Sequence, residues 1–279
     1  MTIIAKESTL KGKVVCVTGA SRGLGKAIAK AFDACGAKLV VGARTQSAVD
    51  ELAAQLNNAI AVQCDVRVAS DVVGMVDAAV GEFGRLDVMI NNAGVAIYGP
   101  LSTTDVEAVN AMIDTNLKGV IFGAQAAFRV MKEQRDGHIV NISSIAGKLH
   151  LKNEAVYSAT KWGVNGFTGA LALEGRKYGV KATAVCPGGI DTPFWKEMDF
   201  HPFSDRVDPE RDFMSPEEVA QSVIQLVATS KGYAVQEVVL APLFRWGMSV
   251  SVIVCVIGLG RFVWSADSRA SITRRIHQS

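Results

Sequence analysis

A regular alternation of short β-branched runs with longer amphipathic segments constrains the fold of this chain more than any other feature. Seven runs have the length and composition of buried strands, at residues 13–19, 37–44, 59–66, 86–94, 138–144, 180–188 and 235–242. Six segments have the spacing of helices, at residues 24–35, 46–57, 70–83, 105–134, 156–178 and 215–229. Strands that alternate with crossover helices favour right-handed βαβ units in a parallel sheet. We therefore expect an α/β fold of the Rossmann type, a doubly wound parallel sheet of about seven strands with helices on both faces.

Residues typical of helix ends bound several of these segments. Gly36 and Gly179 stand where C-terminal caps are expected. Ser215 followed by Pro216 is typical of an N-cap and a first-turn proline. These signals support the helix boundaries that the periodicity predicts.

The turn after the first predicted strand reads VTGASRGLG, with glycines at positions 19, 23 and 25. A glycine costs roughly 0.5–1 kcal/mol relative to alanine in a regular element, so three together suggest that something approaches the backbone closely. In a doubly wound fold the pyrophosphate of a dinucleotide lies at this helix N-terminus. Gly19 would allow the tight turn, Gly23 the approach of the phosphates, and Gly25 the packing of the helix on the sheet. The alternative is a glycine-rich turn without a ligand, because the spacing G-x-x-x-G-x-G differs from the G-x-G-x-x-G of many dinucleotide-binding folds.

Charge and composition argue against several classes of function. The formal net charge of +2 is too small to indicate a nucleic-acid partner. The five cysteines are an odd number, scattered and without a C-x-x-C pair, so we expect free thiols in a reducing compartment. Residues 1–13 lack the apolar core of a secretory signal, so we expect a protein of the cytoplasmic side that is not secreted. The four histidines show no metal-ligand spacing, and we expect no metal.

Three further motifs follow in order along the chain: NNAG at residues 91–94, YSATK at 157–161 and PGGIDTPF at 187–194. Together with the glycine turn, Asp65 and Ser144, they resemble the short-chain dehydrogenase/reductase family, from about residue 11 to about residue 241. The resemblance implies an oxidoreductase that transfers a hydride between a nicotinamide cofactor and a small-molecule carbonyl or alcohol substrate.

The resemblance also implies a catalytic set of Asn116, Ser144, Tyr157 and Lys161. Tyr157 and Lys161 are four residues apart on a predicted helix, so their side chains share a face. A tyrosine with an unperturbed pKa near ~10 is a poor acid at neutral pH, and we expect the lysine ammonium to lower that pKa. Ser144, at the end of a predicted strand, would hydrogen-bond the same substrate oxygen. Asn116 matches the family position that holds a water linking the lysine to solvent, and a helix-bending polar residue is the alternative.

The cofactor expected from the resemblance is NADP(H). The second predicted strand ends at Ala43, where members of the family that prefer NAD carry an aspartate, and Arg44 follows. Arg44 and Arg22 would both contact the 2′-phosphate, because the planar donor fork of arginine suits phosphate. Two solvated surface arginines are the alternative.

Other cofactor contacts also follow from the resemblance. Asp65 would hydrogen-bond the adenine, Asn91 would belong to the ribose side, and Ile190 and Thr192 would contact the nicotinamide end. The expected cofactor-binding residues are Gly19, Ser21, Arg22, Gly23, Leu24, Gly25, Arg44, Asp65, Val66, Asn92, Ala93, Gly94, Tyr157, Lys161, Pro187, Gly188, Ile190 and Thr192.

In the family, the segment corresponding to residues 194–214 folds over the substrate as a lid. Its aromatic residues would line an apolar pocket or pack the lid itself: Phe194, Trp195, Phe200 and Phe203. His201 and Arg206 would meet a polar or anionic group, or lie on a solvated face. Tyr98 and residues 148–154 would form the other walls. The sequence leaves the substrate open among steroids, retinoids, acyl chains, sugars and xenobiotic carbonyls.

The C-terminal end departs from the family pattern. We place the catalytic domain at residues 1–242 and an apolar, then basic, tail at residues 243–279. Segment 246–264 is almost free of charge, and as a helix it would extend about 28 Å, close to the thickness of a membrane core. We expect this segment to attach the protein to a membrane. The alternative is an extra apolar helix that is buried on the domain or in an oligomer interface.

Two other classes of function share this fold: a non-catalytic NADP(H)-binding scaffold or sensor, and an epimerase or dehydratase that acts on sugar nucleotides. The first would be indicated by loss of a catalytic residue, and none is lost. The second usually carries G-x-x-G-x-x-G and a larger C-terminal domain, and neither is present. By the same resemblance we expect a homodimer or homotetramer, formed by pairing of helices 105–134 and 156–178 across a two-fold axis.

Overall fold

The computed structural model describes residues 10–196, 207–229 and 232–242. Contacts divide the chain into two units, Met1–Arg245 and Trp246–Ser279. The expected membrane segment 246–264 lies outside the described residues, as do the expected lid residues Phe200, His201, Phe203 and Arg206. Within the three described stretches, no helix is both long enough and apolar enough to cross a membrane.

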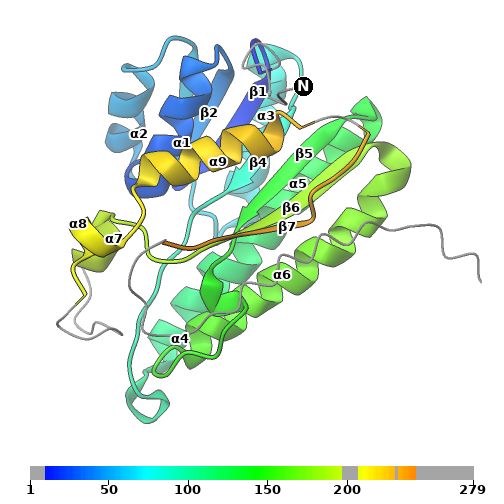
Figure 1. Ribbon diagram of the computed structural model, residues 1–279. Coiled ribbons are helices and arrows are strands. Elements are labelled where there is room, and N and C mark those ends of the chain that lie inside the picture. Colours follow the sequence, from blue (N-terminus) through cyan, green and yellow to red (C-terminus); the bar gives the residue numbers. More distant parts are fainter. Residues whose placement is uncertain (1–9, 197–206, 230–231, 243–279) are drawn as a thin grey trace, which may run out of the picture. The chain divides into compact units, whose positions relative to one another are not determined.

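In the described chain, seven parallel strands form one sheet in the order β3-β2-β1-β4-β5-β6-β7 (Figure 1). The strands are β1 (Val14–Thr18), β2 (Lys38–Ala43), β3 (Ala59–Gln63), β4 (Val88–Asn91), β5 (Gly137–Ile142), β6 (Val180–Pro187) and β7 (Glu237–Leu240). The chain builds outward from β1 to β3 and then returns to place β4 on the other side of β1. The doubly wound, Rossmann-type sheet expected from the sequence is confirmed.

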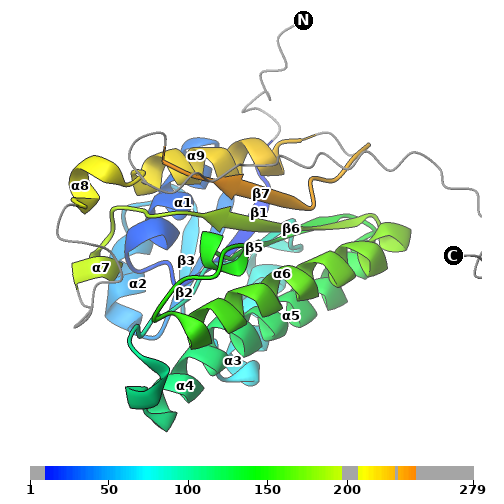
Figure 2. The same ribbon diagram turned by 60° about the horizontal axis from the view of Figure 1, so that its bottom comes forward.

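Helices cover both faces of the sheet (Figure 2). One face carries α1 (Gly23–Ala34), α2 (Gln46–Ala53) and α9 (Pro216–Val227), and the other carries α3 (Ala69–Phe83), α5 (Gly119–Gln134) and α6 (Ala155–Gly175). Alternate residues of β1 serve the two cores: Val15 and Val17 pack with α1, and Val14 and Cys16 with α3. A strand that is buried on both faces must be apolar throughout, which explains the continuous apolar run in the sequence.

The predicted helix ends are found at the expected residues. Gly36 and Gly179 adopt left-handed conformations after α1 and after the last turn that follows α6, with φ of +75° and +72°. At the start of α9, the Ser215 hydroxyl accepts a hydrogen bond from the Glu218 amide, and the Glu218 carboxylate accepts one from the Ser215 amide. These contacts satisfy backbone groups that the ends of the helices leave unpaired.

The segment predicted as a single helix over 105–134 is more complex. It begins as α4 (Val106–Ile113), passes through a π-helical turn at Asp114–Lys118, and continues as α5. Asn116 lies in the π-helical turn and is fully buried. Single π-helical turns are rare and are frequently found at functional sites.

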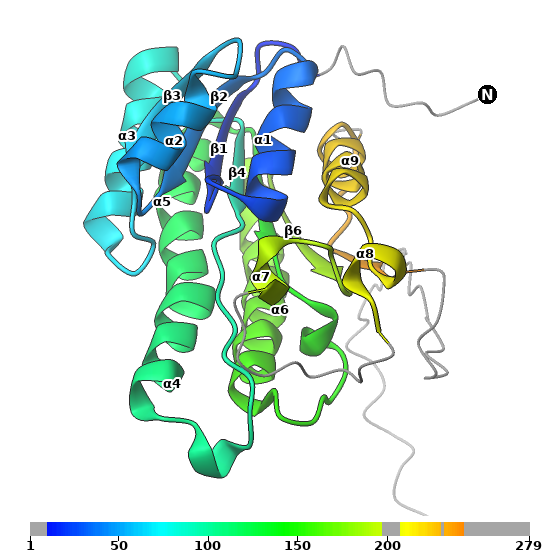
Figure 3. The same ribbon diagram turned by 90° about the vertical axis from the view of Figure 1, so that its left-hand side faces the viewer.

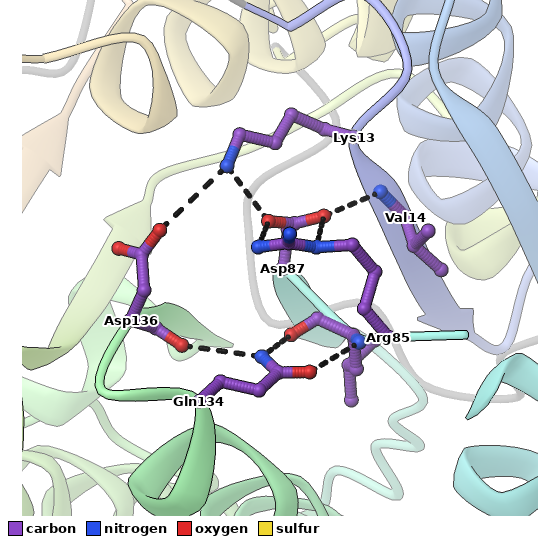
Figure 4. A network of polar contacts seen from close by, with 7 residues as sticks. Lys13, Val14, Arg85, Asp87, Gln134 and Asp136 are labelled. Atoms are coloured by element: carbon purple, nitrogen blue, oxygen red, sulfur yellow. Dashed lines mark hydrogen bonds and ion pairs between the residues drawn. The ribbon is translucent and has the colours of Figure 1, made fainter. Parts of the chain in front are cut away.

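A polar network joins the amino ends of β1, β4 and β5 (Figure 4). The buried carboxylate of Asp87 accepts hydrogen bonds from Lys13 Nζ at 2.7 Å, from the Val14 amide at 3.0 Å, and from Arg85 Nε and Nη2 at 3.0 and 2.7 Å. Burial alone would raise the pKa of Asp87, but these bonds outweigh it and hold the pKa below its usual value. The network fixes the edge of the sheet that is opposite the glycine turn.

The carboxyl ends of the strands lie at the other edge, where the sheet reverses its order between β1 and β4. Ligands of open α/β sheets bind at such a reversal. The segment after β6 carries the short helices α7 (Pro193–Lys196) and α8 (Pro209–Asp212), beyond the carboxyl end of that strand (Figure 3). The candidate site residues converge on this edge.

Candidate active site

The glycine turn between β1 and α1 packs against the chain that follows β4. Gly19 has φ +63°, and a Cβ there would lie only 2.8 Å from the Cα of Ala93. A Cβ on Gly25 would overlap the carbonyl oxygen of Gly19 and lie 2.5 Å from Nδ2 of Asn92. Glycine is therefore required at both positions by the close approach of two backbones.

The N-terminus of α1 has the features of an anion site. Its N-cap residue Arg22 is extended and its side chain does not cap the helix, and no acid stands in the first turn of this helix. Gly23 has φ +53°, and a Cβ there would face Thr192 at 3.5 Å. Ser21 is partly exposed in the same turn, whereas Leu24 is buried in the core. Open amide groups at a helix N-terminus favour a negative ligand, so these residues fit the pyrophosphate of a dinucleotide.

Asn92, which directly follows β4, holds the glycine turn in place through hydrogen bonds. Its Nδ2 donates to the carbonyl oxygens of Thr18 and Gly19 at 2.9 and 3.2 Å. The Thr18 hydroxyl in turn accepts from the amides of Asn92 and Ala93 at 3.0 and 3.2 Å. The threonine before the first glycine thus links the two motifs directly.

Asn91 does not lie where the sequence suggested. Its Nδ2 donates to Oδ1 of Asn141 at 2.8 Å, and a Cβ on Gly123 of α5 would overlap its Oδ1. Successive residues of a strand point to opposite faces of the sheet. The Asn91 side chain is therefore buried between β4 and α5, and the expectation that it lines the ribose side is not supported by this placement.

Tyr157 and Ser144 meet at the carboxyl edge of the sheet. The Ser144 hydroxyl accepts from the Ala146 amide at 3.1 Å and hydrogen-bonds the Tyr157 hydroxyl. Burial raises the pKa of Tyr157 above its usual range, the hydrogen bond from Ser144 opposes this, and the nearby Glu154 carboxylate adds to the increase. A further hydrogen bond from Tyr98 also opposes it.

Lys161 lies on the same face of α6 as Tyr157, as the four-residue spacing predicted. Its Nζ is 5.6 Å from the centroid of the Tyr157 ring and donates to the carbonyl oxygen of Ile142 at 3.0 Å. Burial lowers the pKa of Lys161 to about 8, with the neighbouring Cys186 acting in the opposite sense. The expected lowering of the Tyr157 pKa by Lys161 is not found, because the hydrogen bond of the ammonium goes to Ile142 and burial dominates the shift.

Asn116 connects the catalytic helix to the loop after β4. Its Oδ1 accepts from the Val95 amide and its Nδ2 donates to the Val95 carbonyl oxygen, both at 2.8 Å. The same Nδ2 lies 3.3 Å from the hydroxyl of Thr160, which itself donates to the Tyr157 carbonyl oxygen. A Cβ on Gly94 would lie 3.4 Å from Asn116 Oδ1 and 3.8 Å from Lys161 Nζ. The structure therefore brings the Asn116 and Lys161 side chains together beside Gly94.

Aromatic side chains cover the Tyr157 ring. Tyr98 packs edge-on against Tyr157, with ring centroids 5.4 Å apart, and Trp195 lies 6.3 Å from Tyr98. Trp195 is fixed by a 2.7 Å hydrogen bond from Nε1 to the carbonyl oxygen of Ile190 and by the Phe213 ring at 5.2 Å. Tyr98 and Trp195 thus lie in the aromatic cluster around Tyr157, the expected catalytic tyrosine, where the sequence predicted pocket walls.

The expected adenine end contains an unforeseen arginine. The Asp65 carboxylate accepts from Arg67 Nε at 2.9 Å and Nη2 at 2.5 Å, and this contact lowers the pKa of Asp65. Val66 is buried beside it. Arg44 is exposed after β2, with its carbonyl oxygen accepting from Nε2 of Gln63 at 3.0 Å. The expected polar groups for the adenosine half therefore lie next to one another.

The chain after β6 carries the residues expected at the nicotinamide side. Pro187 ends β6, and the Gly188 amide donates to the Leu240 carbonyl oxygen at 2.7 Å. Ile190 forms an isolated parallel bridge with Met214. These contacts hold the motif that follows β6 against β7 and the start of α9.

One charged residue of the site was not expected from the sequence: Arg67, which follows Asp65 by two positions. Glu154 lies within residues 148–154, the segment expected to form a pocket wall, but its burial was not expected. It precedes Tyr157 by three positions and is 6% exposed. Across the described stretches, no cluster of histidine, cysteine, aspartate and glutamate side chains has the arrangement of a metal site.

Comparison with protein families and curated relatives agrees with this geometry. Residues 13–201 match the family model described as short chain dehydrogenase. An uncharacterized oxidoreductase of Staphylococcus epidermidis is 36% identical over 234 residues, which cover 84% of this chain and 98% of that protein. A 3-oxoacyl-[acyl-carrier-protein] reductase of Synechocystis is 38% identical over 232 residues, which cover 81% and 93%.

Solved structures show the same fold. An alcohol dehydrogenase from the archaeon Thermococcus sibiricus, complexed with 5-hydroxy-NADP, superposes with a TM-score of 0.77 at 26% identity and covers 85% of this chain and 100% of its own. The closed form of a serine dehydrogenase complexed with NADP+ gives a TM-score of 0.75 at 30% identity, over 81% and 94%.

Proposed function

The chain belongs to the short-chain dehydrogenase family of oxidoreductases, and from this premise we propose that it is an NADP(H)-dependent reductase of ketones or aldehydes, able to act in reverse as an alcohol dehydrogenase. One observation carries the proposal. The hydroxyls of Tyr157 and Ser144 are hydrogen-bonded to each other, and Lys161 Nζ lies 5.6 Å from the Tyr157 ring. The glycine turn lies at the same carboxyl ends of the strands.

Tyr157 is the proton donor of the proposed reaction. The glycine turn would hold NADPH, which would supply the hydride for the carbonyl carbon. Tyr157 Oη then gives its proton to the substrate oxygen, while the Ser144 hydroxyl holds that oxygen in place. Because burial raises the pKa of Tyr157, the residue is protonated at neutral pH, which favours reduction.

Lys161 and Asn116 support this step. Lys161 Nζ donates to Ile142 and does not lower the pKa of Tyr157, but it lies 5.6 Å from the Tyr157 ring. Its charge would therefore attract the phenolate that forms when Tyr157 loses its proton. We assign Asn116 to the proton relay, and its side chain also fixes the loop at Val95 that carries Tyr98 toward the site.

The preference for NADP(H) over NAD(H) rests on charge. Ala43 ends β2 without an acidic side chain, and the exposed Arg22 and Arg44 flank the glycine turn and that strand end. An acid at this strand end would bind the ribose 2′-hydroxyl of NAD, whereas arginine accommodates the 2′-phosphate of NADP. The two solved relatives described above bind NADP or a derivative of it, which supports the same choice.

The test is cofactor oxidation by the purified full chain over a panel of ketones and aldehydes, with NADPH and NADH compared. We expect turnover that prefers NADPH and falls by about 10²–10⁴-fold in Tyr157→Phe, the usual contribution of a general acid. Tyr233→Phe is the matched control, because Tyr233 is 54% exposed and lies apart from the site. Tight NADPH binding without turnover of any carbonyl would favour the scaffold alternative.

We also propose that the protein self-associates through α5 and α6. The outward face of α6 carries Trp162 and Leu173 at 44% and 58% exposure, with Gly166 and Gly169 between them. Small residues between two large apolar ones allow a second helix to approach closely and bury both. The resulting homodimer or homotetramer would be the catalytic assembly.

For the tail, residues 243–279, we propose attachment to a membrane on the cytoplasmic side. Segment 246–264 is apolar and the residues after it are basic, which suits an anionic lipid surface. Flotation with anionic lipid vesicles tests this proposal, and a chain that ends at residue 242 is the control.

A further inference from the structure

Glu154 is a buried acid that the proposed reaction does not use. It is 6% exposed and stands at the start of α6, where its side chain does not cap the helix. In the described part of the chain its carboxylate accepts no hydrogen bond and forms no ion pair, and burial is the cause of its raised pKa. A buried charge is normally paired, because leaving it unpaired in a protein interior costs free energy.

The position of Glu154 is built into the fold. The preceding residue, Asn153, is held in a left-handed conformation with φ +66°, and its carbonyl oxygen accepts from the Gly99 amide at 2.9 Å. This bond joins the loop before α6 to the loop that carries Tyr98. Glu154 and Tyr157 are three residues apart on α6, so both face the same side.

The surroundings of Glu154 are aromatic. Its charge acts on the hydroxyls of both Tyr98 and Tyr157 and raises the pKa of each. Trp195 continues the wall beyond Tyr98. Aromatic rings attract a cation through their negative faces, and a carboxylate beside them attracts it further.

Building on the proposed function, we propose that Glu154 binds a positively charged amine of the substrate, so that the preferred substrates are amino ketones and the corresponding amino alcohols. The amine lies against Glu154 and Tyr98 while the carbonyl oxygen lies between Tyr157 and Ser144. The cation supplies the partner that the buried carboxylate lacks in the described chain.

The pKa of Glu154 and the ionisable groups around it determine the pH range in which Glu154 binds a cation. Burial raises the pKa of Glu154 to about 7, so the carboxylate is ionised above neutral pH and protonated below it. The titratable groups on which its charge acts are Tyr98 on the loop after β4 and Tyr157 on α6. Lys161 is turned to the Ile142 carbonyl oxygen, so its ammonium is committed to the sheet side.

The test compares pairs of phenyl ketones that differ only in the end of the side chain, which carries either dimethylammonium or the isosteric isopropyl group. We expect kcat/KM of the full chain with NADPH to favour the cationic ketone by at least about tenfold near pH 8, the lower range for a hydrogen bond to a charged group. In Glu154→Gln the cation-to-neutral ratio should fall to about one. Glu82 is an exposed acid at the C-terminal end of α3, and Glu82→Gln should keep the cation-to-neutral ratio of the unsubstituted protein.

A second measurement needs no variant. With a trimethylammonium ketone and its tert-butyl isostere, the substrate charge does not change with pH, so the ratio should rise as pH increases through about 7. A ratio near one at all pH values, or one unchanged in Glu154→Gln, would overturn the inference. Turnover of the neutral ketones that is lost in Tyr157→Phe would still leave the proposed reductase intact.

Discussion

The ring of Tyr98 stands edge-on to the ring of Tyr157, with the centroids 5.4 Å apart and the planes at 90°. The two hydroxyls are hydrogen-bonded, and that bond lowers the pKa of Tyr157. The loop after β4 therefore takes part in setting the acidity of the reacting group on α6.

Tyr98→Phe keeps the edge-on ring and removes this hydrogen bond. The pKa of Tyr157 should then rise, and oxidation, which needs the ionised tyrosine, should require a more alkaline solution. We expect the acid limb of the pH profile for alcohol oxidation to move upward by as much as about one pH unit, the worth of one hydrogen bond. An unshifted profile in Tyr98→Phe, with cofactor affinity intact, would show that the hydroxyl contact does not tune Tyr157.

Gly25→Ala should abolish cofactor binding. The added methyl group would overlap the Gly19 carbonyl oxygen and displace Asn92, so the turn that faces the pyrophosphate would open. Gly74→Ala is the matched control: Gly74 is exposed on α3 with nothing within 4 Å of the added Cβ, and the change should stabilise the helix by about 0.5–1 kcal/mol. Titration of NADPH by fluorescence and thermal unfolding measure the two effects. Normal NADPH affinity in Gly25→Ala would contradict the assignment of the turn.

Asp87→Asn should destabilise the fold and leave kcat unchanged. The buried carboxylate accepts charged hydrogen bonds from Lys13 and Arg85, and removing its charge weakens both, although Lys13 keeps its ion pair with Asp136 at 3.8 Å. We expect a loss of about 2–4 kcal/mol in the free energy of unfolding. Asp77→Asn breaks only the exposed pair with Arg129 and should cost less than about 1 kcal/mol, as measured by urea unfolding.

His138 should make the protein sensitive to mild acid. It is buried in β5 with Nε2 2.8 Å from the Thr183 hydroxyl, and burial lowers its pKa from 6.5 to about 3. Below pH 6.5 His138 therefore binds a proton in the unfolded chain but not in the folded protein. The free energy of unfolding falls as the pH decreases toward 3. Between about pH 7 and about pH 5 this group should remove about 2 kcal/mol. In His138→Asn the loss between these two pH values should be smaller by that amount, and an equal loss would rule out His138 as its source.

Trp162→Glu should dissociate the proposed oligomer. The substitution places a charge at one end of the apolar face that Trp162 and Leu173 form on α6, where pairing would bury it without a partner. Sedimentation velocity should show a species of half the mass or less. Glu174→Gln, at the C-terminal end of the same helix, is the control and should leave the mass unchanged. If the unsubstituted protein is a monomer, the proposed self-association is wrong.

The doubly wound parallel sheet and most helix boundaries could be predicted because they depend on local periodicity and on turn residues such as Gly36 and Ser215. The spacing of Tyr157 and Lys161 likewise fixed their shared face. Other features depend on burial, which the sequence does not state. The raised pKa of Tyr157 comes from desolvation, and the role of Glu154 depends on the absence of a partner within the described chain.

Asn91 shows a second limit. Motif matching placed it with its neighbours in the cofactor site, but strand alternation turns its side chain to the opposite face of the sheet. The motif NNAG thus contains one asparagine for the core and one for the glycine turn. Side chains of β4 alternate between the two faces of the sheet, and following this alternation to the last residue of the strand would have distinguished Asn91 from Asn92.

The π-helical turn at Asp114–Lys118 has a consequence for how the chain can vary. A turn of this kind holds one residue more than an α-helical turn, so the helices on its two sides keep the faces that they would have in a continuous α-helix. Deleting one residue there would close the turn to an α-helical one and leave α5 packed as it is, but it would remove the bulge in which Asn116 reaches the backbone of Val95. A single-residue deletion at this turn would therefore change the surroundings of Asn116 while sparing the packing of the helix that follows.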